Sequence, residues 1–331
     1  ENGYTLALAG KNHAFKDAEL EAWDFLELYA MHGKEAERFG SAPRPGEEEV
    51  AAWRQREIPF FEAAVHTPQP GSAEDDPTVA QTSHAVHFLQ EHDSEHPFFL
   101  WLSFEAPHFP YVLPEPYFSR SQVDAMPGLL DASLWKQGPQ RLKMQRAGLE
   151  MDGMSEDDVR RIQATYCAMI EMVDEQIGRV MTTLEQTGLA ENTLVIFASD
   201  HGDFWGHRGL VGKSNAVYED LLRIPTIWRG PQVAKGQVSD AIVENTDFTP
   251  TLLELLALNP LPHSEGRSYA EVLRGNSAQH REFSIGESSL GLPAWPTELL
   301  DEDIARREAL FAEEGVMWFV NRLGGMSQSV F

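Results

Sequence analysis

Four short apolar runs, each as long as one β-strand, set the strongest limit on how this chain of 331 residues can fold. The runs are "YTLALAG" (4–10), "PFFLWLSF" (97–104), "TLVIFAS" (193–199) and "IPTIWRG" (224–230). A strand that is apolar at nearly every position is covered on both faces, as in a parallel sheet. Because helical patterns separate the runs, the sequence predicts an α/β sandwich with a largely parallel central sheet flanked by helices.

The helical patterns are of unequal clarity. The clearest covers 155–188, where Ser155 and Asp158 predict a capping box and Gly188 predicts the helix end. Its apolar face repeats every three or four residues, at Val159, Ile162, Tyr166, Met169, Val173, Ile177, Val180 and Leu184. Helices are also expected over 78–92 and 246–258, and the polar stretch 16–60 has a helical bias. The segment 107–155 has no sustained period, which indicates a binding loop or lid.

Side chains capable of chemistry follow three of the predicted strands. They are Lys11 and His13 after the first strand, His108 after the second, and Asp200, His201 and the more distant Lys213 after the third. Ligands of open α/β sheets bind beyond the carboxyl ends of the strands. These side chains are therefore candidates for one shared site.

Asp200 and His201 are candidates for metal ligands. A carboxylate oxygen and an imidazole nitrogen suit a divalent cation such as Ca²⁺, Mn²⁺ or Mg²⁺. Two adjacent ligands cannot fill a coordination sphere of about six. For an isolated Asp-His-Gly the plainer interpretation is a turn-capping aspartate beside a packed histidine. The position at a strand end, with Lys213 following, favours the metal site.

The other candidates point to an anionic ligand. A lysine holds an anionic oxygen as a point charge, and a histidine donates a hydrogen bond or moves a proton. Lys11 and His13 would share a face if the strand continued to them. Alone, Lys-x-His fits a solvated strand end and His108 fits an ordinary loop histidine. Together with the metal ligands, they predict transfer or hydrolysis of a sulfuryl or phosphoryl group.

Charge and composition narrow the classes of partner. Lys and Arg number 26 against 52 Asp and Glu, so the net charge of −26 argues against a nucleic-acid partner, which needs a basic face. Any anion site must therefore be local and cationic. No apolar run approaches the ~18 residues of a membrane span, so none is expected. The one cysteine, Cys167, excludes an internal disulfide and fits helix packing.

Five segments, in order and over nearly the whole chain, resemble the sulfatase family of the alkaline-phosphatase superfamily. They are "GYTLALAGKNH", "FFLWLSFEAPHFPY", "TYCAMIEMVDEQIGRVMTTLEQTGLAENTLVIFASDHGD", "GKSNAVYEDLLRIPTIWRGP" and "VENTDFTPTLLELLAL". The Asp-His-Gly form of the metal-binding turn is most similar to choline-sulfatase-like and phosphonate-monoester-hydrolase-like members. The resemblance implies an alkaline-phosphatase-like sandwich over 1–285 and the start of a smaller C-terminal subdomain over 286–331.

The resemblance also implies a metal centre. Asp200 and His201 would be two ligands of one divalent cation, Ca²⁺ in the first place, with Mn²⁺ or Mg²⁺ as alternatives. The remaining ligands would come from a first strand that bears further acidic or amide side chains. The expected partner is a small-molecule or carbohydrate sulfate ester.

The remaining candidates take their roles from the same resemblance. Lys11 would bridge the nucleophile and the sulfate, and His13 would orient the nucleophile. His108 would bind the sulfate ester and protonate the leaving oxygen. Lys213 would bind the sulfate oxygens.

One family motif does not occur in these 331 residues. The family nucleophile is a formylglycine made from Cys or Ser in C/S-x-P-x-R. "SAPRP" (41–45) has the wrong spacing and follows "GKNH" instead of preceding it, and Cys167 lies in a predicted helix. Since the nucleophile and the first metal-bearing strand belong upstream of "GYTLALAGK", we expect a chain that lacks its first strands and is inactive by itself.

Three functions stay open at this point. Hydrolysis of an organic sulfate ester is favoured by "GKNH", because phosphodiesterase-like relatives tend to carry other polar residues there. A phosphonate or phosphate diester hydrolase on the same fold is the first alternative. A non-catalytic homologue that binds an anion is the second. The alcohol part of the substrate, the oligomeric state and the cellular compartment do not follow from the residues.

Overall fold

The chain divides into two compact units, and each is described by itself. The computed structural model describes residues 3–12, 15, 17–28, 46, 50, 66–131, 133–138, 142–143, 146, 151, 153–213 and 217–286. Unit 1 comprises the described residues within Glu1–Thr187 and Asp203–Ser214, and unit 2 comprises those within Gly188–Gly202 and Asn215–Ser288. The predicted subdomain over 286–331 lies outside the described residues except for Gly286, so its boundary stays a prediction.

Three parallel strands form the sheet of unit 1. Strand β1 (Thr5–Gly10) lies between β2 (Phe25–Leu28) and β3 (Phe98–Ser103). In the register, Gly10 is the partner of both Leu28 and Ser103. All three strands therefore end at one edge of the sheet, and the loops that follow β1 and β3 start side by side.

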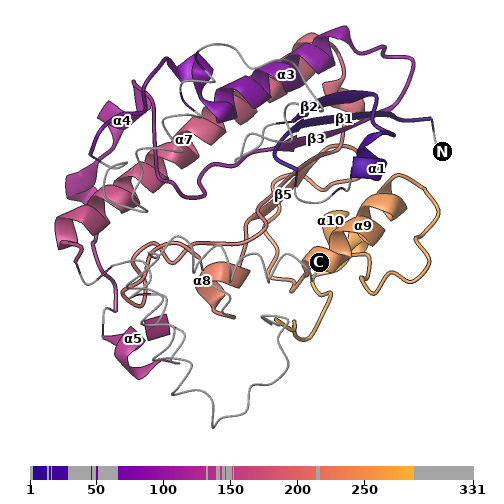
Figure 1. Ribbon diagram of the computed structural model, residues 1–331. Coiled ribbons are helices and arrows are strands. Elements are labelled where there is room, and N and C mark those ends of the chain that lie inside the picture. Colours follow the sequence, from indigo (N-terminus) through magenta and orange to yellow (C-terminus); the bar gives the residue numbers. More distant parts are fainter. Residues whose placement is uncertain are drawn as a thin grey trace. The chain divides into compact units, whose positions relative to one another are not determined.

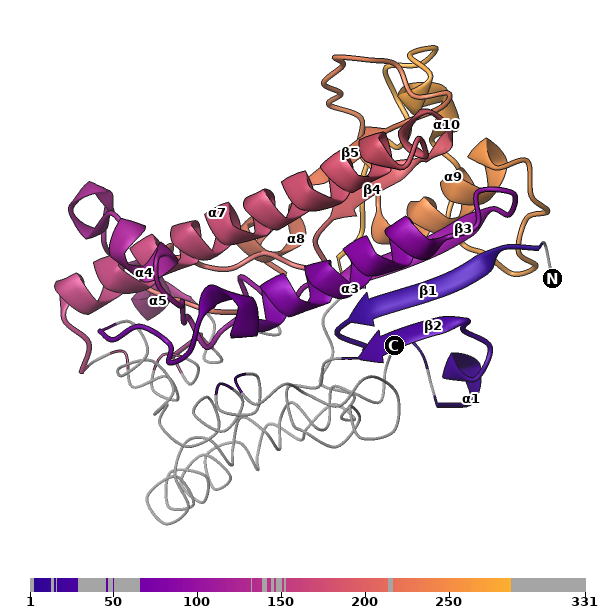
Figure 2. The ribbon, with the colours of Figure 1, turned by 90° about the horizontal axis from the view of Figure 1, so that it is seen from above.

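Strand β1 is the buried centre of this sheet. Its residues Ala7, Leu8 and Ala9 are at most 1% exposed. The alanine side chains are small, which lets neighbouring elements pack closely against the strand. Helix α3 (Pro77–Glu91) packs along the sheet, and α7 (Glu156–Gln186) packs beside α3 (Figures 1 and 2). Strand β3 is less covered than its apolar sequence predicts, because Trp101 is 41% exposed.

An aromatic cluster joins α3 to the two outer strands of the sheet. The ring of Phe88 on α3 lies 5.4 Å from that of Phe25 on β2 and 5.9 Å from that of Phe98 on β3. Aromatic pairs at such spacings add about 0.5–1.5 kcal/mol to the energy of their area burial. The cluster therefore fixes where α3 lies on the sheet.

Both ends of α7 follow the predicted signals. The Ser155 hydroxyl accepts the Asp158 amide at 3.1 Å, and the Asp158 carboxylate accepts the Ser155 amide at 2.9 Å, which is the expected capping box. The helix ends at Gln186, with Thr187 as the cap and Gly188 in the left-handed region at φ +76°. The predicted apolar stripe is confirmed where burial is deepest, at Val159, Ile162, Met169, Val173 and Leu184.

Short helices complete unit 1, and one predicted segment is corrected. The helices are α1 (Asp17–Leu20), η1 (Ala73–Asp75), α4 (Tyr117–Arg120), η2 (Val123–Ala125) and α5 (Leu134–Gln137). The helical bias of 16–60 is wrong at Phe25–Leu28, which forms β2 because pairing with the central strand overrides local propensity. No helix in the described part of the chain has the length and apolarity needed to cross a membrane.

Unit 2 contains the last two predicted strands, which pair with each other. Strands β4 (Val195–Ala198) and β5 (Thr226–Arg229) are antiparallel, so the expected parallel arrangement holds for β1, β2 and β3 but not for this pair. The helices of the unit are η3 (Ala190–Asn192), α8 (Glu219–Leu222), η4 (Asn245–Asp247), α9 (Phe248–Leu255) and α10 (Ala270–Leu273).

One buried carboxylate organises the start of α9. Asp247 is fully buried and accepts hydrogen bonds from the Arg281 guanidinium, the Arg267 amide and His280. Burial alone would raise the pKa of the Asp247 carboxyl, but these donors outweigh burial and hold that pKa well below its usual range. The carboxylate is therefore charged in the folded state, and it fastens the chain near 281 to the helix.

Replacing this carboxylate is expected to weaken the fold. Asp247→Asn leaves the Arg281 charge half-compensated in a buried place, and breaking such a pair costs about 3 kcal/mol of the free energy of unfolding. Chemical denaturation of the purified chain measures this loss. Asp240→Asn, at an exposed position of the same unit, serves as the control and should leave the free energy unchanged.

The pair of Asp247 and Arg281 also predicts that the free energy of unfolding depends on pH in the acid range. The pKa of Asp247 is lower in the folded than in the unfolded state, so its contribution is complete above the unfolded pKa of about 4 and is lost as the pH falls further. The wild-type chain should therefore lose more stability below pH ~4 than Asp247→Asn does. Equal acid sensitivity of the two proteins would contradict this role.

Candidate functional site

Lys11 stands at the edge of the sheet where β1 and β3 end together. Its backbone amide donates to the Ser103 carbonyl oxygen at 3.1 Å, which extends the pairing one residue beyond β1. Gly10 has φ +114°, and a Cβ at that position would clash with the same carbonyl. Only glycine therefore lets the chain turn away here while the two strands stay paired.

The chain turns immediately after Lys11. The Asn12 side-chain amide donates to the Phe15 carbonyl at 2.8 Å, and its oxygen accepts the Phe15 amide at 2.9 Å. The strand does not continue, so the argument that Lys11 and His13 share a strand face does not apply. His13 itself lies outside the described residues.

His108 lies in the segment that follows β3. Its backbone amide donates to the Glu105 carbonyl at 2.9 Å, and its ring packs on the Phe109 ring at 4.3 Å. Its Nδ1 lies 2.5 Å from the Phe109 carbonyl oxygen, a hydrogen bond that requires the proton on Nδ1. The neutral ring therefore keeps its proton on Nδ1, and a second proton would be carried on Nε2.

Residues 203–213 form a closed loop, here called the Lys213 loop. The Phe204 amide donates to the Gly212 carbonyl at 2.9 Å, so the two ends of the loop meet. Phe204, Leu210 and Val211 are fully buried, which gives the loop an apolar core of its own. Lys213 is exposed at the end of this loop.

The carboxylate of Asp203 holds the loop at its base. Its Oδ1 accepts the amides of Trp205 at 2.8 Å and Gly212 at 3.0 Å, and its Oδ2 accepts the Tyr111 hydroxyl at 2.7 Å. Burial raises the pKa of the Tyr111 hydroxyl well above its usual value, and the nearby negative charge of Asp203 raises it further. The hydroxyl therefore stays protonated and remains a hydrogen-bond donor. Since Tyr111 follows His108 by three residues, this bond joins the His108 segment to the Lys213 loop.

Asp200 and His201 follow β4 in unit 2. His201 Nδ1 lies 2.8 Å from the Gly202 carbonyl oxygen, and its Nε2 lies 3.7 Å from Asp200 Oδ1. The Nδ1 bond orients the ring as in metal-binding histidines, whose other nitrogen binds the ion. The two side chains therefore fit part of the coordination sphere of a hard divalent cation. Within the described residues, no group of three or more His, Cys, Asp or Glu side chains could hold a metal ion.

The structure thus sorts the predicted residues into two sets. Lys11, His108 and Lys213 belong to unit 1, and Asp200 and His201 belong to unit 2. The sequence interpretation missed Asp203 and Tyr111, which connect the first set. Asp203 ends the motif "SDHGD" and Tyr111 ends the motif "PHFPY". Their hydrogen bond joins residues that are 92 positions apart, so no local sequence pattern predicts it.

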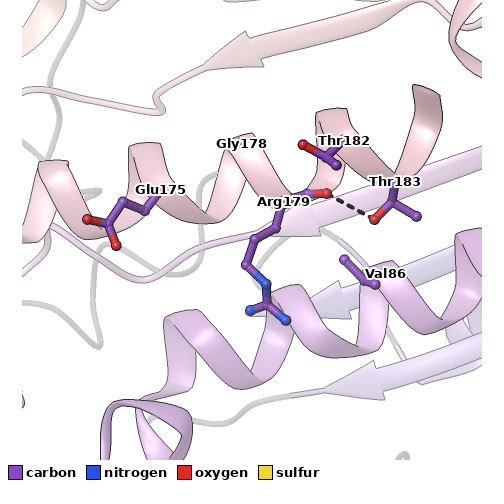
Figure 3. Close-up of a pocket in the computed structure, with 6 residues that line it drawn as sticks. All are labelled: Val86, Glu175, Gly178, Arg179, Thr182 and Thr183. Atoms are coloured by element: carbon purple, nitrogen blue, oxygen red, sulfur yellow. Dashed lines mark hydrogen bonds between the residues drawn. The ribbon is translucent and has the colours of Figure 1, made fainter. Parts of the chain in front are cut away.

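The groove in Figure 3 does not contain these residues. Val86 of α3 and five residues of α7 line it, namely Glu175, Gly178, Arg179, Thr182 and Thr183. Arg179 spans the groove, with hydrogen bonds to Gln176 and to Ser83 of α3. The groove is therefore part of the packing between α3 and α7, and it holds none of the candidate side chains.

Comparison with known proteins gives a family match and two similar relatives. Residues 1–258 match the family model described as Sulfatase. The arylsulfatase of Clostridium perfringens is 29% identical over 219 residues, which cover 65% of this chain and 45% of the relative. The choline-sulfatase of Rhizobium meliloti is 29% identical over 293 residues, which cover 82% of this chain and 54% of the relative. The chain thus spans about half the length of these curated relatives.

A solved structure gives the same fold. The phosphonate monoester hydrolase SpPMH of Silicibacter pomeroyi matches with a TM-score of 0.69 and 23% identity, over 91% of this chain and 65% of that protein. At this identity the likeness concerns the fold, and it confirms the predicted alkaline-phosphatase-like α/β class.

The bond between Tyr111 and Asp203 yields a test of the site framework. Tyr111→Phe removes the hydroxyl that donates to Asp203 Oδ2 and should lower the free energy of unfolding by about 1–3 kcal/mol. Tyr166→Phe is the matched control, because its ring packs on Tyr111 without a hydrogen bond to Asp203. Equal losses in the two variants, measured by denaturant unfolding, would show that packing alone joins the two segments.

Proposed function

The chain belongs to the sulfatase family, and we propose that the protein containing it hydrolyses an organic sulfate ester and releases inorganic sulfate. The observation that carries the proposal is the support of Lys11, His108 and Lys213 on connected segments of unit 1. These are two lysines and one histidine in a chain of net charge −26. An anionic group that is transferred in a reaction, such as a sulfuryl group, is the ligand that such a set of side chains suits best.

In this proposal the lysines hold the oxygens of the sulfuryl group. Lys213 is presented by a loop whose backbone is fixed by Asp203, and Lys11 is presented from the end of the central strand. Fixed cations stabilise the charge that develops on the transferring group and need no reorganisation during the reaction. Lys11 and Lys213 would therefore act mainly on the transition state.

His108 would supply the proton for the leaving alcohol. The bond from sulfur to the ester oxygen breaks, and the sulfur gains an oxygen that derives from water. The protonated His108 ring keeps Nδ1–H on the Phe109 carbonyl and gives its Nε2 proton to the departing oxygen. The products are one alcohol and one sulfate, and the proton returns to the histidine from the water consumed.

Asp200 and His201 would hold the divalent cation, with Ca²⁺ preferred and Mn²⁺ or Mg²⁺ as alternatives. Their side-chain atoms converge, and the Nδ1 bond of His201 to Gly202 directs the opposite nitrogen to the ion. A bound cation would polarise an oxygen of the anion as a Lewis acid. The other ligands, and a formylglycine nucleophile, would come from residues outside these 331, because C/S-x-P-x-R does not occur among them.

The substrate class is tested by rates on two model esters. We expect the natural protein that contains this chain to hydrolyse an aryl sulfate faster than an aryl phosphonate monoester. Preference for the phosphonate would favour the alternative activity, which the likeness to SpPMH keeps open at the level of fold. Binding of sulfate without turnover of either ester would indicate an anion-binding homologue.

The role of Lys213 is tested in the same assay. Lys213→Ala should lower the rate on the aryl sulfate more than about tenfold, since a charged contact to a transferring group is worth several kcal/mol. Lys235→Ala removes an exposed lysine from unit 2 and is the matched control. Turnover close to wild type in Lys213→Ala would show that this lysine is only a surface residue.

The metal assignment is tested by binding. Calorimetric titration of the natural protein, stripped with a chelator, should show one Ca²⁺ site that His201→Ala weakens by about 10–100-fold. His96→Ala is the control, because His96 bonds Asp93 at 2.9 Å in a pair that resembles His201 and Asp200 only in residue type. Unchanged affinity in His201→Ala would remove this histidine from the metal site.

A further inference from the structure

We propose that Gln163, a buried residue of α7, is a positioning residue that sets the place of the Lys213 loop. Gln163 is fully buried, and its side-chain hydrogen bonds go to Gly128 and Trp205 and not to a candidate anion-binding or metal-binding residue. The effect of Gln163 on activity rests on the role proposed above for Lys213. The effect of Gln163 on the structure of the loop does not rest on that role, so the effect on activity and the effect on the loop can be measured separately.

Three hydrogen bonds hold the Gln163 side-chain amide in place. Its oxygen accepts the Gly128 amide at 2.9 Å. Its nitrogen donates to the Gly128 carbonyl at 2.8 Å and to the Trp205 carbonyl at 2.7 Å. The Trp205 indole donates in return to the Gln163 backbone carbonyl at 3.3 Å. One side chain thus links Trp205 of the Lys213 loop and the segment at Gly128 to the same helix.

The loop has an uncommon backbone at the point where Gln163 holds it. Trp205 lies at φ +47° and Gly206 at φ +95°. A Cβ on Gly206 would come within 2.6 Å of the Gln163 nitrogen and 2.8 Å of the Gly128 carbonyl oxygen. The left-handed conformation of Trp205 is costly by itself, so it needs outside support. The amide of Gln163 provides a donor for the Trp205 carbonyl that this conformation turns inward.

A short chain of bonds runs from Trp205 to Lys213. The Trp205 amide and the Gly212 amide share the same oxygen of Asp203, and Lys213 is the next residue. A shift of Trp205 would therefore move the Asp203 carboxylate and, through Gly212, the backbone next to Lys213. Because a lysine aimed at a transferring group is sensitive to about 1 Å of misplacement, a remote anchor can affect the rate strongly.

Gln163 is a buried polar residue of α7, and its chain neighbours Ile162 and Ala164 are apolar and at most 1% exposed. Its buried amide is satisfied by the hydrogen bonds to Gly128 and to the Lys213 loop. Gln176, between three and four turns further along α7, is a natural comparison. It is 4% exposed and accepts a hydrogen bond from Arg179 on the same helix, without contact to the loop.

The positioning claim is tested by hydrogen exchange. Gln163→Met keeps the volume but removes all three bonds, and peptides that cover 203–213 should exchange at least about tenfold faster than in the wild type. Gln176→Met should leave exchange in that loop unchanged while α7 stays intact in both variants. Unchanged loop exchange in Gln163→Met, or equal acceleration in Gln176→Met, would overturn the proposal.

The functional consequence is tested by a double-mutant cycle in the natural protein. Gln163→Met should lower kcat on the aryl sulfate by about tenfold or more with little change in KM, and by less than about threefold once Lys213→Ala is present. Equal losses in both backgrounds would show that Gln163 does not act through Lys213. If Lys213→Ala itself has full activity, the proposed role of Lys213 fails, and the exchange result still decides whether Gln163 places the loop.

Discussion

The pairing of β1 with β3 is the constraint on which the candidate anion site depends. It brings Lys11 and the segment leading to His108 to one edge, although 97 residues separate them in the chain, counted from 11 to 108. Gly10 makes this possible because no side chain blocks the approach to Ser103. The central strand is also the most buried element of unit 1, so the edge is anchored to its core.

A second layer of polar contacts ties the loop that carries Lys213 to the segment that contains His108. Asp203 gathers two amides of its own loop and the hydroxyl of Tyr111, and Gln163 supports the same loop from α7. Tyr111 and Gln163 are buried, and an unpaired polar atom would be costly there. The backbone that carries one exposed lysine is thus held by polar contacts within the protein.

The parts of this arrangement that have a local signature were predictable from the sequence. The capping box at Ser155, the strands before Lys11 and before His108, and the fold class follow from patterns within a few residues. Strand β2 was not predictable, since its four residues become a strand only through pairing with β1. The pairing of Asp203 with Tyr111 was not predictable for the same reason, because a hydrogen bond across 92 residues leaves no local pattern in the sequence.

The buried apolar core of the Lys213 loop has a consequence for the energetics of ligand capture. Phe204, Leu210 and Val211 order the loop when the chain folds, so the conformational entropy of that backbone is already lost before any anion arrives. In the proposed role of Lys213, anion binding would not have to order the backbone of this loop. The cost of ordering would then fall on side chains, at about 0.5–1.5 kcal/mol for each one that binding fixes.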